Sequence, residues 1–252
     1  MRDAMDGSTH GMVSRIYNLW AWLVVWPMLL LLTAALGTLA LLLGLVSHRA
    51  GFWCGTVWGW LLCRLNFTPV QVVGREHAVP GQAYVILANH RSYFDILAFY
   101  GHWPRQFRWV MKAELRRVPF LGWATAVLGN LFIDRHDRGR AMAQLREARS
   151  LLVQGISVML FPEGTRSPSG QMLEFRKGGF VLAVDAGLPI LPVSISGTYP
   201  VLPPQQITPR PGRIRITVHP PIPTTGLGQE DIGALSDRVR GVIASGLEPH
   251  EV

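Results

Sequence analysis

A histidine and an aspartate five residues apart are the first side chains in this sequence that could perform acid–base chemistry. His90 and Asp95 lie in the stretch Asn-His-Arg-Ser-Tyr-Phe-Asp, directly after the apolar run Tyr84 to Ala88. Five residues correspond to about 140° around a regular helix, so the two would not share a helical face. The spacing suits a strand that turns into a helix, where Asp95 points back toward His90. The pattern predicts a histidine general base that a carboxylate orients.

The same residues also have a purely structural interpretation. Ser92 followed three residues later by Asp95 is a capping box, which would serve only to begin a helix. The residue pattern alone leaves catalysis and capping both open. We favour Ser92 as an N-cap over Ser92 as a covalent nucleophile.

A second polar turn follows another apolar run about seventy residues later. It is the stretch Phe-Pro-Glu-Gly-Thr-Arg-Ser, from Phe161 to Ser167. Gly164 allows a ligand to approach the backbone closely, Thr165 offers a hydroxyl, and Arg166 offers a planar fork that suits phosphate. A surface turn with an incidental pair between Glu163 and Arg166 would explain the same residues.

The elements that must position these turns follow the pattern of an α/β domain. After Arg64, short β-rich runs alternate with helical ones. The expected strands are Val70–Val73, Tyr84–Ala88, Phe107–Met111, Leu131–Ile133, Ser157–Phe161, Ile190–Ile195 and Ile214–Val218. The expected helices are Tyr93–Tyr100, Phe120–Leu128, Gly139–Gln154, Gly179–Ala186 and Asp231–Ala244. Both polar turns then follow strands, where open α/β sheets place ligand sites, and the proline-rich passages Pro200–Pro211 and Pro220–Thr225 are expected loops.

An uncharged apolar stretch precedes this domain. Residues Ile16 to Ser47 include no Asp, Glu, Lys or Arg, and the stretch exceeds the roughly 20 residues that a spanning helix needs. It either crosses a bilayer with tilt or breaks into a hairpin near Pro27, Gly37 or Gly44. We expect it to be retained, because it is too long for a secretory signal. We therefore divide the chain into a membrane-anchoring helical region, residues 1–64, and an α/β domain, residues 65–252.

Aromatic residues at both ends of this stretch are expected to anchor it at membrane interfaces, although a place in the core would also explain them. They are Trp20, Trp22, Trp26, Phe52, Trp53, Trp58 and Trp60. Gly51 to Leu62 is interpreted as a second, shorter helix in or near the interface.

The net charge of +8 belongs to the residues after the apolar stretch. A basic surface beside a membrane segment favours anionic lipid head groups as partners and a cytoplasmic position for the α/β domain. Nucleic acid is a competing partner, but the sequence has no recognisable nucleic-acid module. The two cysteines, Cys54 and Cys63, lie in the apolar region, so we expect neither a disulfide framework nor a metal site.

Taken together, the two polar turns resemble the 1-acyl-sn-glycerol-3-phosphate acyltransferase family, whose first motif is N-H-x-S-x-x-D and whose third is F-P-E-G-T-R-S. Every fixed position of both motifs is present. Further matches are Val110–Leu115 with Pro119 and Gly122, the second motif Gly129–Arg135, and the fourth motif Leu191–Val193. The resemblance covers roughly Val72 to Val218. It implies a glycerolipid acyltransferase-type domain, a mixed sheet flanked by helices, behind an N-terminal hydrophobic helical anchor.

The resemblance also implies a reaction. A glycerol hydroxyl of lysophosphatidic acid would attack the thioester of acyl-CoA or acyl-carrier protein, giving phosphatidic acid, with His90 removing the proton and Asp95 orienting it. The acceptor's phosphate would be bound by the second-motif arginine and the third motif, which are Arg135, Glu163, Gly164, Thr165 and Arg166. Because a carboxylate repels phosphate, Glu163 should orient Arg166 or neighbouring backbone. No cofactor beyond the acyl donor is expected.

Lys112 and Lys177 are the only lysines, and both lie near motif segments, so each is either a phosphate contact or a solvated surface residue.

The same fold acting on another acceptor, such as a lyso-ornithine lipid or a lysophospholipid, is an alternative. A non-catalytic protein that binds anionic lipid is a remote one, since lipid binding needs no base. The sequence includes neither the G-x-S-x-G elbow nor the P-loop pattern G-x-x-x-x-G-K-[ST]. The expected location is the inner (cytoplasmic) membrane, with the catalytic domain on the cytoplasmic side.

Overall fold

A mixed β-sheet forms the centre of the α/β domain. The computed structural model describes residues 15–134 and 138–252. Within these residues seven strands pair in the order β1-β7-β6-β2-β5-β3-β4. Their bounds are β1 Val70–Val73, β2 Val85–Ala88, β3 Phe107–Lys112, β4 Leu131–Ile133, β5 Ser157–Leu160, β6 Ile190–Ser196 and β7 Ile214–Val218. All pairings are parallel except that of β6 with β7, so the predicted mixed sheet is confirmed.

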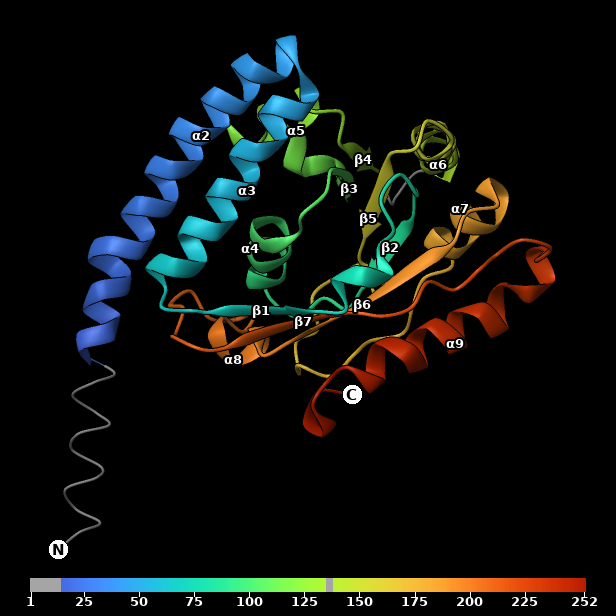
Figure 1. Cartoon of the computed structure of the whole chain (residues 1–252). Coiled ribbons are helices and arrows are strands. Elements are labelled where there is room, and N and C mark those ends of the chain that lie inside the picture. Colours follow the sequence, from blue (N-terminus) through green and yellow to red (C-terminus); the bar gives the residue numbers. More distant parts are fainter. Residues whose placement is uncertain (1–14, 135–137) are drawn as a thin grey trace, which may run out of the picture.

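Helices cover both faces of this sheet (Figure 1). The helices α4 Tyr93–His102 and α5 Leu121–Val127 lie on the same side as the N-terminal helices. The opposite side carries α6 Arg138–Val153, α7 Gly178–Ala186 and α9 Ile232–Ser245, and a short helix, α8 Thr198–Val201, follows β6. Each face has its own hydrophobic core. The strands β2 and β6 are buried along their whole length, which explains why their sequences are apolar without alternation.

The N-terminal apolar stretch forms one continuous helix rather than a hairpin of its own. Residues Arg15–Val46 are helical; their most apolar 18-residue window has a mean hydropathy of 2.5, and only 11% of that window is buried. This helix comprises η1 Ala21–Val25, a π-helical turn, and α2 Trp26–Val46. The chain turns at Ser47, and α3 His48–Leu65 returns beside α2. By length and composition the helix could cross a membrane.

The three predicted break points do not break the helix. Pro27 lies inside the continuous helix, directly after the π-helical turn Ala21–Val25, and such a local change of helix type lets a helix continue past a proline that lacks an N–H. Gly37 and Gly44 instead allow close packing, because a Cβ atom on Gly37 would lie 3.1 Å from Phe120, and one on Gly44 would lie 3.0 Å from Val127. The hairpin therefore forms between α2 and α3, beyond all three residues.

The helix predicted over Gly51–Leu62 is confirmed as part of α3, but one of its faces is core. Phe52 and Leu62 are buried with α4, so the interpretation of Phe52 as an interfacial anchor is wrong. A Cβ atom on Gly59 would lie 2.5 Å from the Leu97 carbonyl oxygen, which shows how closely α3 and α4 pack. Trp53 and Trp60 remain 41% and 42% exposed, as an interfacial position requires.

Candidate active site

His90 and Asp95 meet where β2 turns into α4. His90 Nδ1 lies 2.9 Å from Asp95 Oδ2, which leaves Nε2 as the nitrogen that can take up a proton. The same Oδ2 accepts hydrogen bonds from the backbone N–H groups of Arg91 at 2.6 Å and Ser92 at 2.8 Å. Asp95 is fully buried, whereas the His90 side chain is 13% exposed. A fixed carboxylate behind a reachable imidazole is the arrangement that general-base catalysis requires.

The capping interpretation of Ser92 is also correct. Ser92 is the N-cap of α4, and its Oγ accepts a hydrogen bond from the Phe94 N–H at 3.1 Å. The hydroxyl is buried and donates to the Leu202 carbonyl oxygen at 2.8 Å. These contacts occupy the hydroxyl and support the N-cap role over that of an acyl carrier. Asp95 therefore serves the helix start and the histidine at once.

Two further contacts join the first polar turn to the second. Glu163 Oε1 accepts a hydrogen bond from the His90 backbone N–H at 2.6 Å, and Glu163 Oε2 accepts one from the Leu173 N–H at 2.8 Å. The Phe161 ring stacks on the His90 imidazole, with 4.0 Å between centroids and 10° between planes. Glu163 thus orients neighbouring backbone, as expected. The role of Phe161 was not predicted, because a ring at the end of an apolar strand carries no signal of a stacking partner.

The environment of Glu163 opposes its negative charge. Burial raises the pKa of Glu163 to about 7, although the N–H groups of Leu173 and His90 favour the charged form. The nearby carboxylate of Asp95 acts in the same direction as burial. Two buried carboxyl groups therefore contact His90: Glu163 accepts from its backbone N–H, and Asp95 pairs with its imidazole.

The rest of the second turn presents its polar groups on the same side as His90. Gly164 has a φ of +75°, which favours glycine. The Arg166 guanidinium carbon lies 3.7 Å from the centroid of the Tyr93 ring, a cation–π contact between the two motifs. Arg166 Nη1 is buried and has no hydrogen-bond partner among the described residues. The fork is thus held by a ring, and one of its donors has no protein partner in this part of the chain.

A large apolar cavity opens beside these groups. Its volume is about 710 Å³, and its walls come from α2, α3, α4, α5 and both polar turns. His90, Thr165, Arg166 and Lys112 line it together with apolar side chains of the helical hairpin. The N-terminal helices and the α/β domain therefore build one site. A lipid chain with a polar end would match this combination of surfaces.

The other predicted binding residues lie differently. Lys177 is exposed just before α7 and is not among the described residues that line the cavity. Arg135 lies outside the described residues. The predicted roles of both remain predictions.

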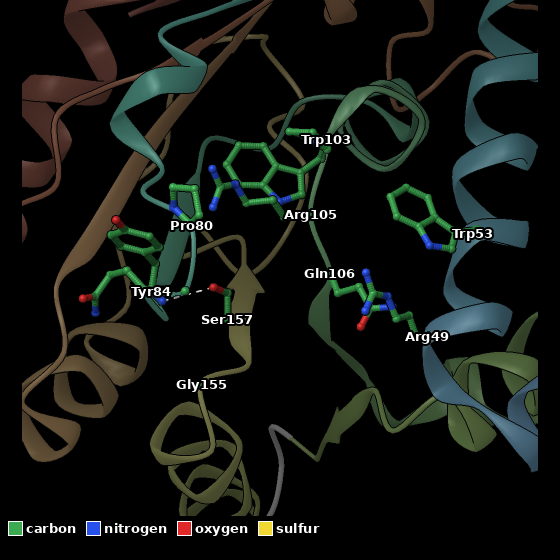
Figure 2. Close-up of a pocket in the computed structure, with 12 residues that line it drawn as sticks. Arg49, Trp53, Pro80, Tyr84, Trp103, Arg105, Gln106, Gly155 and Ser157 are labelled. Atoms are coloured by element: carbon green, nitrogen blue, oxygen red, sulfur yellow. Dashed lines mark hydrogen bonds between the residues drawn. The ribbon is translucent and has the colours of Figure 1, made fainter.

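A second, smaller hollow lies near the starts of the central strands β2 and β5 (Figure 2). Its volume is about 310 Å³, and Arg49, Arg105 and Gln106 line it with Tyr84 and Ser157. Tyr84 and Ser157 sit at the starts of β2 and β5, whereas the two polar turns follow the ends of these strands. This hollow is therefore separate from the candidate active site.

Comparisons with known proteins agree with this geometry. The family model described as Acyltransferase matches residues 69–196, about half of the chain. The 1-acyl-sn-glycerol-3-phosphate acyltransferase alpha of Bos taurus is 40% identical over 172 residues, 68% of this chain and 60% of that protein. The chain thus spans about 60% of the length of this relative. The 1-acyl-sn-glycerol-3-phosphate acyltransferase of Pseudomonas aeruginosa is 37% identical over 69% of this chain and 67% of its own length.

A solved structure extends the likeness beyond the matched motifs. The crystal structure of the 1-acyl-sn-glycerophosphate (LPA) acyltransferase, PlsC, from Thermotoga maritima aligns with a TM-score of 0.77 and 28% sequence identity. The alignment covers 94% of this chain and 95% of that one, so it includes the helical hairpin as well as the sheet. Together with the two motifs that meet at His90, these matches show that the chain belongs to the 1-acyl-sn-glycerol-3-phosphate acyltransferase family.

Proposed function

We propose that this chain transfers a fatty acyl group from a thioester to the sn-2 hydroxyl of 1-acyl-sn-glycerol-3-phosphate, which yields phosphatidic acid. The observation that carries the proposal is the position of the His90–Asp95 pair in the wall of an apolar cavity that Arg166 also lines. Acylation of a lysophosphatidic acid requires a base, a cation for the phosphate and an apolar space for the chains. The names of the similar proteins support this acceptor.

The base acts on the acceptor's hydroxyl. The hydroxyl oxygen forms a bond to the thioester carbonyl carbon while His90 Nε2 takes the hydroxyl proton. The carbon–sulfur bond then breaks, and the proton passes from the imidazolium to the departing thiolate. Asp95 stabilises the imidazolium, and a base of this kind typically contributes about 10²–10⁴-fold to the rate.

The acceptor's phosphate is bound beside the base. Arg166 offers a fork that Tyr93 holds from one side, and Lys112 adds an exposed positive charge on the same cavity. Arg135 and Lys177 are further candidates on sequence grounds. The donor is acyl-CoA or acyl-carrier protein, and the thioester provides the driving force without a cofactor, since a thiolate with a pKa of about 8.5 is a good leaving group.

The enzyme works at a membrane surface. The apolar helix Arg15–Val46 lines the cavity and is long enough to cross a bilayer, which supports a position of the cavity close to the lipid that supplies the acceptor. Net positive charge in the residues after this helix favours the cytoplasmic side of the inner membrane. Protease protection in membrane vesicles of known orientation tests the side: cleavage of the α/β domain from the extracytoplasmic face would contradict it.

The experiment that tests the activity is acyl transfer by the purified protein in detergent. Labelled oleoyl-CoA or acyl-carrier protein is the donor, lysophosphatidic acid is the acceptor, and phosphatidic acid is the product measured. We expect product from the wild type and almost none from folded His90→Ala, whereas His48→Ala, which removes an exposed imidazole, should retain activity. Acylation of another lyso-lipid instead would overturn the acceptor, and no transfer with any acceptor would overturn the enzymatic proposal.

A further inference from the structure

A buried arginine lies inside the catalytic turn. Arg91, between His90 and Ser92, is fully buried, and its backbone N–H donates to Asp95 Oδ2 at 2.6 Å. Its guanidinium brings a buried positive charge into the turn that carries His90, because an arginine side chain is charged in proteins. Such a charge needs a partner, because an unpaired buried charge is costly.

The partner comes from the segment that follows α9. Glu251, in the short 3-10 helix Pro249–Glu251, is only 3% exposed. Its Oε1 lies 2.9 Å from Arg91 Nη1. Arg91 Nη2 also donates to the Ile195 carbonyl oxygen at 2.6 Å, and Nη1 donates to the Gly170 carbonyl oxygen at 3.3 Å. The guanidinium is thus held away from the cavity by one carboxylate and two carbonyls.

Glu251 is itself held in its charged form. Burial alone would raise the pKa of Glu251, but the Ser196 hydroxyl, the Arg91 charge and the N–H groups of Gly197 and Glu248 together hold it below its usual value. The Ser196 hydroxyl donates to Oε2 at 2.5 Å, and the Gly197 N–H donates to Oε1 at 3.1 Å. Both donors lie at the end of β6, so Glu251 connects the segment after α9 to the sheet.

Without Glu251, the carboxyl groups left near Arg91 would belong to the site itself. Asp95 accepts from the Arg91 backbone, and the Arg91 charge acts on Glu163. Without Glu251, the buried positive charge of Arg91 would be left without a carboxylate partner, and its field would act on the carboxyl groups of the site instead. We infer that Glu251 is a positioning residue for the acyl transfer: by neutralising Arg91, it reserves the Asp95 carboxylate for the His90 imidazole. The inference rests on the proposed function.

The kinetic test uses Glu251→Gln, which retains the shape of the side chain and removes its charge. We expect kcat per folded enzyme to fall about 10- to 100-fold, as for a displaced catalytic group, while KM for lysophosphatidic acid changes less than about threefold, since the phosphate contacts are elsewhere. Glu230→Gln, which removes an exposed carboxylate, is the matched control and should retain the wild-type kcat. Adding Arg91→Met to Glu251→Gln removes the unpaired charge and should restore most of kcat.

A second readout does not depend on the substrate. The NMR signal of the His90 Nδ1 proton reports its hydrogen bond to Asp95; it should shift in Glu251→Gln and remain unchanged in Glu230→Gln. If the wild type acylates no lyso-lipid but this shift occurs, the proposed function is wrong, whereas the neutralisation of Arg91 by Glu251 and its effect on the His90–Asp95 pair are supported. If Glu251→Gln is merely less heat-stable, with kcat per folded enzyme within twofold of wild type and an unshifted signal, the residue is only structural and the inference is overturned.

Discussion

Replacing Asp95 by asparagine should separate the charge of the carboxylate from its hydrogen bonds. All three donors, from His90, Arg91 and Ser92, converge on the single oxygen Oδ2. The other oxygen, Oδ1, is buried without a hydrogen-bond partner among the described residues. An asparagine can therefore place its carbonyl oxygen at the Oδ2 position and keep all three bonds. What it loses is the negative charge beside the imidazolium.

The magnitude follows from Coulomb's law. Two unit charges about 4 Å apart interact by about 4 kcal/mol at an effective dielectric constant near 20, which corresponds to a rate factor of about 10³. We expect Asp95→Asn to lower kcat about 10²- to 10³-fold, with little change in KM, because the imidazolium forms only during the reaction. His90→Ala should cost about 10²- to 10⁴-fold. The double variant should be no slower than His90→Ala alone, since Asp95 acts only through the histidine.

The assay is the initial rate of phosphatidic acid formation, normalised to the folded fraction measured by thermal unfolding. Asp237→Asn, on the exposed face of α9, is the matched control for loss of one carboxylate and should leave the rate unchanged. Two results would refute the reasoning. One is a rate for Asp95→Asn within about threefold of wild type, and the other is a double variant whose loss is the product of the two single losses.

Three further predictions concern other parts of the site and fold. Burial raises the Glu163 pKa from 4.5 to about 7, so the folded protein should lose up to about 3 kcal/mol of stability as the pH rises from 4.5 to 7. In unfolding measurements at several pH values, Glu163→Gln should abolish this loss of stability with rising pH, and an unchanged pH dependence would contradict the prediction. Arg166→Lys should raise KM for the acceptor at least about tenfold with kcat nearly constant, because the planar fork is lost; an unchanged KM would exclude a phosphate contact. Gly101→Ala should lower stability by about 1–3 kcal/mol, since its Cβ would lie 2.4 Å from the Trp60 backbone nitrogen; exposed Gly241→Ala is the control, and equal melting temperatures would refute the clash.

Local signals in the sequence predicted the elements of the domain well. The strands Val70–Val73, Leu131–Ile133 and Ile214–Val218 have the predicted bounds, and the other four differ by one residue at one end. This accuracy has a physical reason, because capping residues, apolar periodicity and turn-forming glycines act within a few residues of one another. The capping pair Ser92 and Asp95 was correctly placed for the same reason.

Contacts between distant residues carried no such signal. Arg91 pairs with Glu251, which lies 160 positions further along the chain. The residues next to either side chain in the sequence do not indicate this partner. The sequence also could not show whether the apolar stretch forms one helix or breaks. Gly37 and Gly44 are residues at which a helix often breaks, but in this structure they allow Phe120 and Val127 to pack closely against the helix. In both cases the tertiary arrangement decides between two locally reasonable outcomes.

The two motifs meet for two reasons, one local in the sequence and one that depends on the strand order of the sheet. The strands β2 and β5 are parallel neighbours, with Val85 opposite Val158. His90 and Glu163 each come five residues after these partners, so equal strand and turn lengths bring both to the same edge of the sheet. Each length could be read from the sequence, whereas the adjacency of β2 and β5, which the chain separates by β3 and β4, could not. An insertion of one residue in either turn should therefore separate Glu163 from the His90 N–H and disable the base while leaving the strands paired.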